Sequence, residues 1–366
     1  MTEHPEPEEL RELCRLVLAD RNPRTLFDSA DEQRALWREL TNIGWAGVLL
    51  PEALGGLDWS WREAAILAEE LGRTLVPVPF LSNALVAASG LRILENATAT
   101  ATLKHIAGGE WQVAVAGLPS ARQPADSVVV GPAGDRLRGT CWFVLDATSA
   151  DHLLVVADRD GATVLTRVKT GEGVELIPHQ LADPSRSAAT VIFHDTPATI
   201  VASGIDADRA LAAMETALTV GLACDALGGA RRVFDETVQY ARTRIQFGRP
   251  IGSFQAIKHQ LADLYVLLEG MTAIIDAAVA QIDDPTHEID YQTGSLASLA
   301  YAYAADAYAR IAGDSILIHG AIGFTWEHDA HLYLKRALLN QQLAGPVADH
   351  RDRHLAQKIA SIGATP

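Results

Sequence analysis

The chain has 366 residues, 48% of them hydrophobic, and a formal net charge of −16 at pH 7. This length allows more than one buried core, so two or three domains are expected. The chain has no basic cluster, which argues against nucleic acid and anionic membrane surfaces as partners. It also has no continuous run of about 18 apolar residues, which argues against a membrane span.

The N-terminus and the cysteines indicate in which cellular compartment the protein is expected. Met1 to Glu12 is acidic and lacks an apolar core segment, so we expect no signal peptide. Cys14, Cys141 and Cys224 are far apart and lack the spacing of a metal site. Sparse thiols are typical of a cytosolic protein that keeps its cysteines reduced. We therefore expect a cytoplasmic protein without a metal site.

The first hundred residues are typical of helices. An apolar stripe with i, i+3, i+4, i+7 spacing extends from Leu10 to Val17. Capping boxes at Ser29–Glu32 and Ser60–Glu63 each predict the start of a further helix. Two prolines then interrupt the pattern before another helix, at about Leu81 to Leu94.

After Gly109 the pattern changes to short β-branched and aromatic runs. Five of them lie at residues 111–115, 127–130, 141–145, 152–156 and 190–193. Turn residues separate them, and no long helix intervenes. This pattern favours a small antiparallel sandwich or barrel.

From Asp206 the helical pattern returns. The segment from Asp206 to Tyr240 has no proline, and its apolar residues form one stripe that ends at Asp225. Three more helical stretches follow, at residues 253–282, 291–318 and 329–343. We therefore predict a mainly α protein with a helical domain at 1–110, a central β-domain at 111–203 and a four-helix bundle at 204–366.

Three motifs resemble those of a known family. Residues 240–255, YARTRIQFGRPIGSFQ, and residues 319–329, HGAIGFTWEHD, resemble the C-terminal signatures of the acyl-CoA dehydrogenases. GWAGVLLP at residues 44–51 resembles the early signature of that family. The resemblance covers almost the whole chain and implies the same three-domain fold.

The resemblance also implies an activity. Family members hold FAD and an acyl-CoA thioester, and they pass electrons to an electron-transfer flavoprotein. A carboxylate takes the proton α to the thioester carbonyl, and the β-carbon gives hydride to the flavin. An oligomer, most often a tetramer, is implied as well.

The first motif contains residues that match family positions contacting the ADP portion of FAD on a neighbouring subunit. These are Arg244, Gln246, Phe247 and Gln255. An arginine suits a diphosphate because its planar guanidinium donates two parallel hydrogen bonds. The alternative interpretation is an exposed helix end with Phe247 in a core.

The second motif matches a glycine turn close to FAD, with His319, Gly320 and Gly323 at the family positions. Two residues depart from the family pattern, because Leu317 replaces a usual glutamine and Ala321 replaces a usual glycine. His319 fits a hydrogen-bonded turn residue better than a catalytic one.

The usual catalytic carboxylate is missing. Alignment with the family places Ala344 at that position, and Leu218 at the position where a minority of members carry the base instead. Glu215, one turn before Leu218, is the first alternative base, and Asp225 is the second. Each also has a structural interpretation, as a solvated carboxylate and as a helix–helix contact, respectively.

The expected flavin-facing segments depart from the family too. Residues 115–119, VAGLP, lack the threonine and glutamate of the usual loop. Residues 139–146, GTCWFVLD, lack a usual threonine or serine followed by asparagine.

Three hypotheses follow. The first is a complete acyl-CoA dehydrogenase with a relocated base. The second is a non-catalytic subunit that completes the FAD site of a catalytic paralogue, as in heteromeric family members that act on sterol side-chain CoA thioesters. The third is a flavin scaffold reused for a non-redox task. The sequence does not identify the acyl group.

Overall fold

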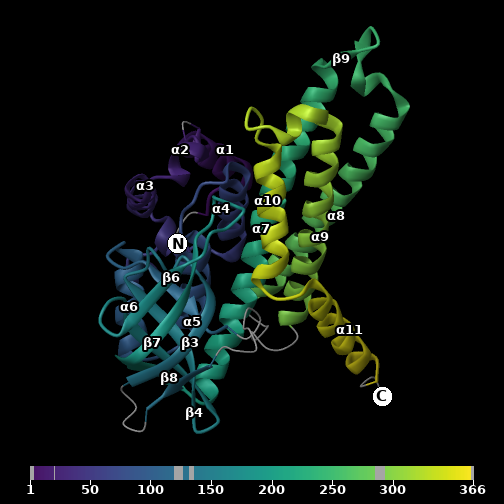
Figure 1. The fold of residues 1–366 in the computed structure, drawn as a ribbon. Helices are drawn as coiled ribbons and strands as arrows, with labels where there is room; N and C mark the ends of the chain where they lie inside the picture. The colour runs from purple at the N-terminus through teal and green to yellow at the C-terminus, as the bar shows by residue number, and fades with distance from the viewer. Residues whose placement is uncertain (1–3, 20, 119–126, 132–135, 285–292, 364–366) are drawn as a thin grey trace.

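A computed structural model of the chain describes residues 4–19, 21–118, 127–131, 136–284 and 293–363. N-terminal helices and a β-sheet lie side by side, and long C-terminal helices pack beside both (Figure 1). The order of elements predicted from the sequence, helices, then strands, then long helices, is confirmed.

The N-terminal helices begin at recognisable caps. Ser60 and Glu63 form the complete predicted capping box of α4, whereas Ser29 accepts a hydrogen bond from the Glu32 amide at the start of α3. The elements are α1 (Pro7–Leu18), α2 (Pro23–Phe27), α3 (Ala30–Asn42), η1 (Trp45–Gly47), η2 (Glu52–Leu54), α4 (Trp61–Thr74), η3 (Phe80–Ala87), α5 (Ala88–Arg92) and α6 (Ala97–Ala107).

The helix expected at Leu81 to Leu94 differs from the prediction. Residues Phe80–Ala87 instead form the π-helix η3, and all eight are buried. A π-turn holds more residues than an α-turn and is found most often at functional sites. Periodicity does not separate the two forms over a segment that is apolar on every side.

The central domain is one mixed sheet. Its strands are β1 (Val113–Ala116), β2 (Ser127–Val130), β3 (Arg136–Leu145), β4 (His152–Arg159), β5 (Ala162–Lys169), β6 (Val174–Pro178), β7 (Ala188–Pro197) and β8 (Thr199–Ser203). The order is β6-β7-β3-β2-β4-β5-β8, with β1 beside β4. Most pairs are antiparallel as predicted, but β1 and β2 each pair with β4 in parallel.

An aromatic stack joins α6 to the sheet. The Trp111 ring lies between His105 and His152, at 3.9 Å from each ring centre, and Arg167 covers Trp111 at 4.9 Å. Burial, followed by the Arg167 charge, lowers the pKa of His152 to about 4. His152 is therefore neutral in the folded protein at neutral pH.

Five long or medium helices follow the sheet: α7 (Ile205–Thr243), α8 (Gln255–Asp283), α9 (Thr293–His319), α10 (Ala330–Leu343) and α11 (Val347–Gly363). The first four were predicted. The sequence analysis missed α11, which extends away from the bundle (Figure 1). With 39 residues, α7 is about 58 Å long.

Helices α4 and α7 cross at close range. A Cβ atom added at Gly72 would lie 2.2 Å from the Asp225 carbonyl oxygen, and one at Gly228 would lie 1.8 Å from that of Glu69. Only glycine fits at both positions. The crossing fixes α7 against the N-terminal domain.

Two helices are long and apolar enough to cross a membrane by length and composition. Windows of 18 residues in α7 and α8 both have a mean hydropathy of 1.4. In α7, 78% of that window is buried inside the protein, but in α8 only 28% is. The lack of one continuous apolar run therefore does not by itself exclude a span, and α8 presents apolar surface.

Candidate functional site

Four segments that the sequence analysis considered separately meet at one small cavity, here called the apolar cavity. Leu118 follows β1, Trp142 and Leu145 belong to β3, Leu218 belongs to α7, and Leu343 ends α10. The departures in the two flavin-facing segments and at Leu218 thus lie at one site, beside the Leu343–Ala344 end of α10. Pro119, at the end of the first segment, lies outside the described residues.

The apolar cavity is too small and too apolar for a flavin ring. Its volume is about 40 Å³, whereas an engineered cavity of roughly 150 Å³ holds one benzene. Ser82 supplies a hydroxyl to its lining, but that hydroxyl already donates to Asp146 at 2.6 Å. The residues present do not fit the ring that the family resemblance places here.

Among the residues that the structure describes, no carboxylate lines the apolar cavity. Ala344 is buried, and its neighbour Leu343 and the aligned Leu218 both present aliphatic side chains. Glu215 lies one turn before Leu218 on α7 and is partly buried, but it is not among the lining residues. Its role as a base stays a prediction.

Asp225 belongs to a buried group of charges, here called the interior ion cluster, formed by Asp183, Ser185, Arg186, Asp225, Arg336 and Asn340. Arg336 Nη1 donates to Asp225 Oδ1 at 2.7 Å, and Asn340 Nδ2 donates to Oδ2 at 2.8 Å. Arg336 Nε also donates to Asp183 at 2.9 Å.

These partners decide the charge state of Asp225. Burial raises its pKa, but Arg336, Arg186 and the Asn340 amide outweigh burial and lower the pKa. An ionised carboxylate with both oxygens already bonded is a weak base. The geometry of Asp225 therefore agrees with its structural interpretation, because Asp225 connects α7 to α10 through Arg336 and Asn340.

The Arg244–Gln255 motif forms a projecting hairpin, here called the hairpin. Strands β9 (Ile245–Gln246) and β10 (Arg249–Pro250) pair around Phe247 and Gly248, whose φ angles are 52° and 77°. Two positive φ angles define a type I′ turn, which favours asparagine and glycine. A phenylalanine in this conformation is strained, and such strain is concentrated at functional sites.

The hairpin residues point into solvent. Phe247 is 92% exposed, and Arg244, Gln246 and Gln255 are exposed as well. Among the described residues, Arg244 has no side-chain hydrogen bond or ion pair. The alternative interpretation of Phe247 as a core residue is therefore wrong, and an exposed guanidinium is the kind of group that binds a diphosphate.

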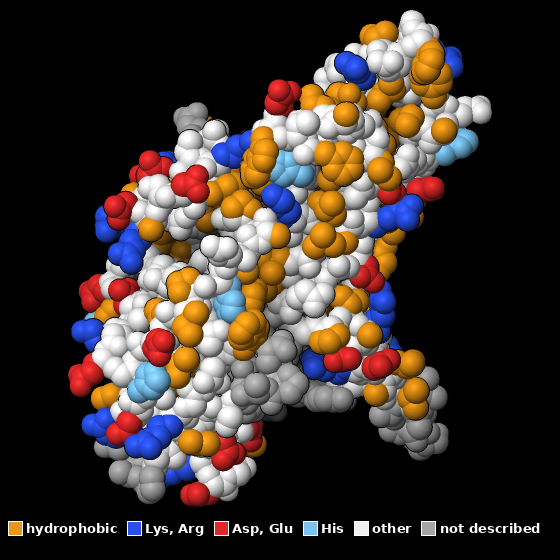
Figure 2. All heavy atoms as spheres, viewed as in Figure 1, with side chains coloured by type: hydrophobic (Ala, Val, Ile, Leu, Met, Phe, Trp, Pro, Cys, Tyr) orange, Lys and Arg blue, Asp and Glu red, His pale blue; other side chains and the backbone are white. Residues whose placement is uncertain are grey.

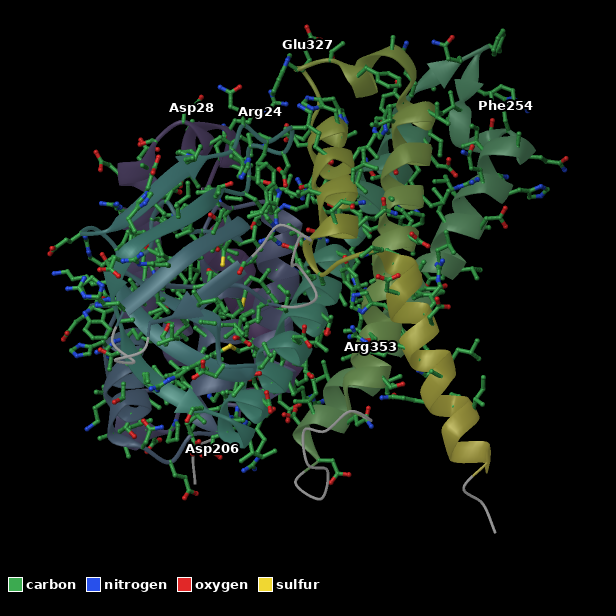
Figure 3. All side chains as sticks on the ribbon, turned by 60° about the horizontal axis from the view of Figure 1, so that its bottom comes forward. Arg24, Asp28, Asp206, Phe254, Glu327 and Arg353 are labelled. Atoms are coloured by element: carbon green, nitrogen blue, oxygen red, sulfur yellow. The ribbon has the colours of Figure 1, made fainter. Side chains whose placement is uncertain are left out.

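The hairpin is far from the apolar cavity of the same chain. Arg244 follows Leu218 along the rigid helix α7 by about 39 Å. Phe254, beside the hairpin, and Asp206, in the first turn of α7, lie at opposite ends of the molecule (Figure 3). One dinucleotide cannot contact both sites of one chain.

The glycine turn adjoins the C-terminal end of α7. His319 is buried, its Nδ1 lies 2.8 Å from the Ser315 carbonyl, and its ring stacks on Tyr240. Burial lowers the pKa of His319. Gly320 has a φ of 67° and an open Cβ position, whereas a Cβ at Gly323 would lie 3.0 Å from a backbone oxygen.

Exposed apolar side chains gather near this turn. Leu317, Phe324 and Trp326 are each more than 60% exposed. Hydrophobic side chains are frequent over the C-terminal helices, whereas charged ones crowd the N-terminal and β-domain side (Figure 2). Apolar surface of this kind is typical of an interface.

The sequence analysis did not identify Asp183, Arg186 or the role of Arg336. Asp183 and Arg186 appear in the sequence only as charged residues of a turn before β7, and Arg336 only as one arginine within a helix. Neither pattern is specific enough to predict a buried ion cluster. No cluster of potential metal ligands occurs in the part of the chain that the structure describes.

Comparisons with protein families agree with the predicted resemblance. The model for the acyl-CoA dehydrogenase N-terminal domain matches residues 4–110, and the model for the C-terminal domain matches residues 211–357. The acyl-CoA dehydrogenase IpdE2 of Mycolicibacterium smegmatis is 34% identical over 312 residues, which are 85% of this chain and 84% of the relative. IpdE2 of Mycobacterium tuberculosis is 35% identical over 310 residues, 84% and 82% of the two chains.

Two solved structures are similar throughout. The steroid ACAD variant Tcur3481-Tcur3483 is 29% identical with a TM-score of 0.86, and the match covers 98% of this chain and 99% of that one. The ChsE4-ChsE5 complex from Mycobacterium tuberculosis contains a chain that is 25% identical, with a TM-score of 0.86 over all of both chains.

Proposed function

This chain belongs to the acyl-CoA dehydrogenase family, and from that premise we propose that it is one subunit of a heteromeric acyl-CoA dehydrogenase. In this complex the hairpin binds the ADP portion of an FAD whose ring lies in a paralogous subunit. That paralogue carries the catalytic base. The complex converts an acyl-CoA thioester to its α,β-unsaturated form and passes the electrons to an electron-transfer flavoprotein.

The contrast between the hairpin and the apolar cavity carries this proposal. The apolar cavity is lined by Leu218 at one base position, Ala344 at the other follows the lining residue Leu343, and the cavity is too small for a flavin ring. The hairpin keeps an exposed Arg244 and a strained, exposed Phe247. A general loss of function would be expected to affect the hairpin as well as the apolar cavity.

The relatives support a heteromer and a substrate class. One similar structure is named as a steroid ACAD, and another as a complex of ChsE4 with ChsE5. We therefore propose a steroid-derived CoA thioester as the substrate of the complex.

We further propose that the complex is a tetramer built through the C-terminal helices. The apolar surface of α8 and the exposed Leu317, Phe324 and Trp326 supply the contact area. Light scattering of the purified protein should give a mass above the 39.2 kDa of one chain. A monomer at micromolar concentration would contradict the proposed assembly.

Flavin content provides the decisive experiment. Expressed alone, the chain should be colourless or poorly flavinated, and co-expression with the paralogue should give about one FAD per pair. A yellow homo-oligomer with one FAD per chain that oxidises an acyl-CoA unaided would refute the proposal.

Two matched variants test the role of the hairpin. Arg244→Gln should weaken FAD binding by the co-expressed complex at least about tenfold, since charge-assisted bonds to the diphosphate are lost. Arg242→Gln, on an exposed arginine two residues earlier, should leave FAD binding unchanged. Equal effects would show that general surface charge, and not the hairpin, attracts the cofactor.

A complete enzyme with Glu215 as its base is the second candidate, because Glu215 is partly buried one turn from Leu218. In that case Glu215→Gln should lower turnover of the flavinated protein at least about a hundredfold. Asp225→Asn is the corresponding test of the lesser candidate. In a partner subunit, Glu215→Gln should leave the turnover of the complex unchanged.

A further inference from the structure

A second cavity lies where the three parts of the fold meet. Its volume is about 250 Å³, and it is here called the junction cavity. Its walls come from α3, α4 and η3 on one side, from the β3–β4 and β6–β7 connections on another, and from α7 and α10. This volume exceeds the roughly 150 Å³ that holds a benzene ring, so the cavity accepts a ring with a substituent.

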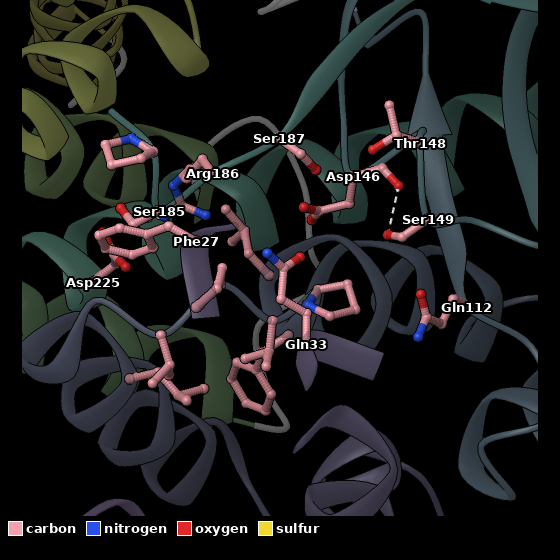
Figure 4. A pocket seen from close by; sticks show the side chains of 18 of the residues that line it. Phe27, Gln33, Gln112, Asp146, Thr148, Ser149, Ser185, Arg186, Ser187 and Asp225 are labelled. Atoms are coloured by element: carbon pink, nitrogen blue, oxygen red, sulfur yellow. Dashed lines mark hydrogen bonds and ion pairs between the residues drawn. The ribbon is translucent and has the colours of Figure 1, made fainter. Parts of the chain in front are cut away.

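The junction cavity has both apolar and polar lining residues. Phe27, Leu71, Val76 and Phe80 supply apolar surface. Asp146, Ser187 and Arg186 come from the β-domain, and Gln33 enters from the opposite side, so that polar groups converge from different elements (Figure 4). A mostly apolar pocket with a few convergent polar groups is typical of a small-molecule site.

Arg186 is a buried cation with unused hydrogen-bonding capacity. Its side chain is 8% exposed, and its Nη2 lies 3.2 Å from Asp225 Oδ2. Among the described residues, its Nε has no hydrogen-bond partner. Asp225 is shared with Arg336 and Asn340, so it compensates Arg186 only in part. A buried donor left in this state costs free energy that a ligand oxygen would recover.

Asp146 does not accept a hydrogen bond from Arg186 Nε. Its Oδ2 accepts a hydrogen bond from Ser82, and burial raises its pKa, which favours the neutral form. Further out, Arg34 lines the same cavity from α3 with an exposed side chain that has no ion pair among the described residues. Guanidinium donors are therefore present both deep in the cavity, at Arg186, and further out, at Arg34.

We propose that the junction cavity binds a carboxylate carried on an apolar, ring-sized body, and that Arg186 binds the carboxylate. The planar guanidinium matches the two oxygens of a carboxylate better than it matches a single acceptor. The apolar walls cover the body of the ligand, and Arg34 draws the anion to the opening.

The carboxylate has two possible sources. It is either a free carboxylic acid or the distal carboxylate of an acyl-CoA, because Leu81 lines both the junction cavity and the apolar cavity. The chemistry at Arg186 is the same for both. Binding of a free acid requires neither flavin nor a partner subunit, so its failure leaves the proposed heteromer untouched.

Ligand-observed NMR and calorimetry on the full chain test the proposal with three probes. These are cyclohexanecarboxylate, its neutral amide, and the CoA monothioester of cyclohexane-1,4-dicarboxylic acid. We expect saturable binding of a carboxylate probe, with the amide at least about tenfold weaker because it lacks the charge-assisted pair. Binding of the thioester alone assigns the site to the acyl group, and binding of the free acid assigns it to a separate ligand.

Two variants locate the binding site. Arg186→Gln should abolish carboxylate binding, and Asp225 keeps Arg336 and Asn340 as partners in that variant. Ala30→Phe adds bulk to the exposed α3 side of the cavity without touching the ion cluster and should weaken binding, so it decides the question if Arg186→Gln fails to fold. Equal affinity for acid and amide, unchanged binding in Ala30→Phe, or no binding of either carboxylate would overturn the proposal.

Discussion

In the interior ion cluster, Arg336 donates to Asp183, Ser185 and Asp225, and its side chain is 3% exposed. In the hairpin, Arg244 extends into solvent beside a strained and exposed Phe247. The first arginine is bound by groups of its own chain, whereas the second has no described partner there.

The difference separates residues kept for folding from residues kept for binding. Breaking the cluster leaves carboxylates buried without a partner, which costs several kcal/mol. Removing a hairpin side chain leaves nothing buried, so the isolated fold should not respond. Stability and flavin binding should therefore respond to different substitutions.

The largest effect on stability should follow Arg336→Met. Asp183 and Asp225 then lose their shared guanidinium inside the protein, and the free energy of unfolding should fall by about 3–5 kcal/mol. Urea denaturation measures the loss. Arg244→Gln, as the matched control, should change it by less than about 0.5 kcal/mol. Similar values for the two variants would remove the distinction between the regions.

A smaller effect should follow Gly228→Ala at the α4–α7 crossing. The added methyl would lie 1.8 Å from the Glu69 carbonyl oxygen, so the helices must separate, at a cost of about 1–3 kcal/mol or more. Gly313→Ala in α9 meets no atom within 4 Å and should stabilise the helix by about 0.5–1 kcal/mol. Thermal denaturation should show the opposite signs, and an unchanged or raised melting temperature for Gly228→Ala would contradict the close crossing.

Acid should weaken the protein through His152. The folded-state pKa of about 4 lies below the ordinary value, so the unfolded chain binds the proton more readily. This contribution is complete above about pH 6.5 and is lost as the pH falls towards 4, by roughly 1–2 kcal/mol. His152→Gln should flatten the pH profile of the urea midpoint over that window. Parallel profiles would mean that His152 does not titrate there.

The smallest effect should follow Phe247→Asn. Asparagine tolerates a positive φ better than phenylalanine, so the isolated chain should gain about 0.5–1 kcal/mol. The co-expressed complex should nevertheless bind FAD more weakly, because the exposed ring is lost. A chain that loses stability, or a complex that keeps its full flavin affinity, would show that Phe247 serves the fold.

Sequence patterns predicted the elements whose cause is local. The capping box at Ser60–Glu63 and the proline-free stretch of α7 were both visible in the sequence. The π-helix at Phe80–Ala87 was not, because a segment buried on all sides has no face to reveal its period. Helix α11 was missed because it follows Gly345 and Pro346, which are typical of the end of a helix and not of the start of another long one.

The candidate site was predictable only in part. The motif identified the hairpin, and alignment with the family located the missing base. In the interior ion cluster, Arg336 binds Asp183 and Asp225, each of which lies more than a hundred residues before it in the chain. Local spacing encodes neither that pairing nor the Nε of Arg186, which has no hydrogen-bond partner among the described residues.

The stack of His105, Trp111 and His152 has an optical consequence. An imidazole in van der Waals contact with an indole quenches its fluorescence more strongly once protonated, and the two rings here are 3.9 Å apart. The emission of Trp111 should therefore report both the protonation of His152 and the docking of α6 on the sheet. The difference spectrum between the protein, with its seven tryptophans, and Trp111→Phe isolates that signal. The junction between helix and sheet thus contains an intrinsic fluorophore that follows local opening without a label.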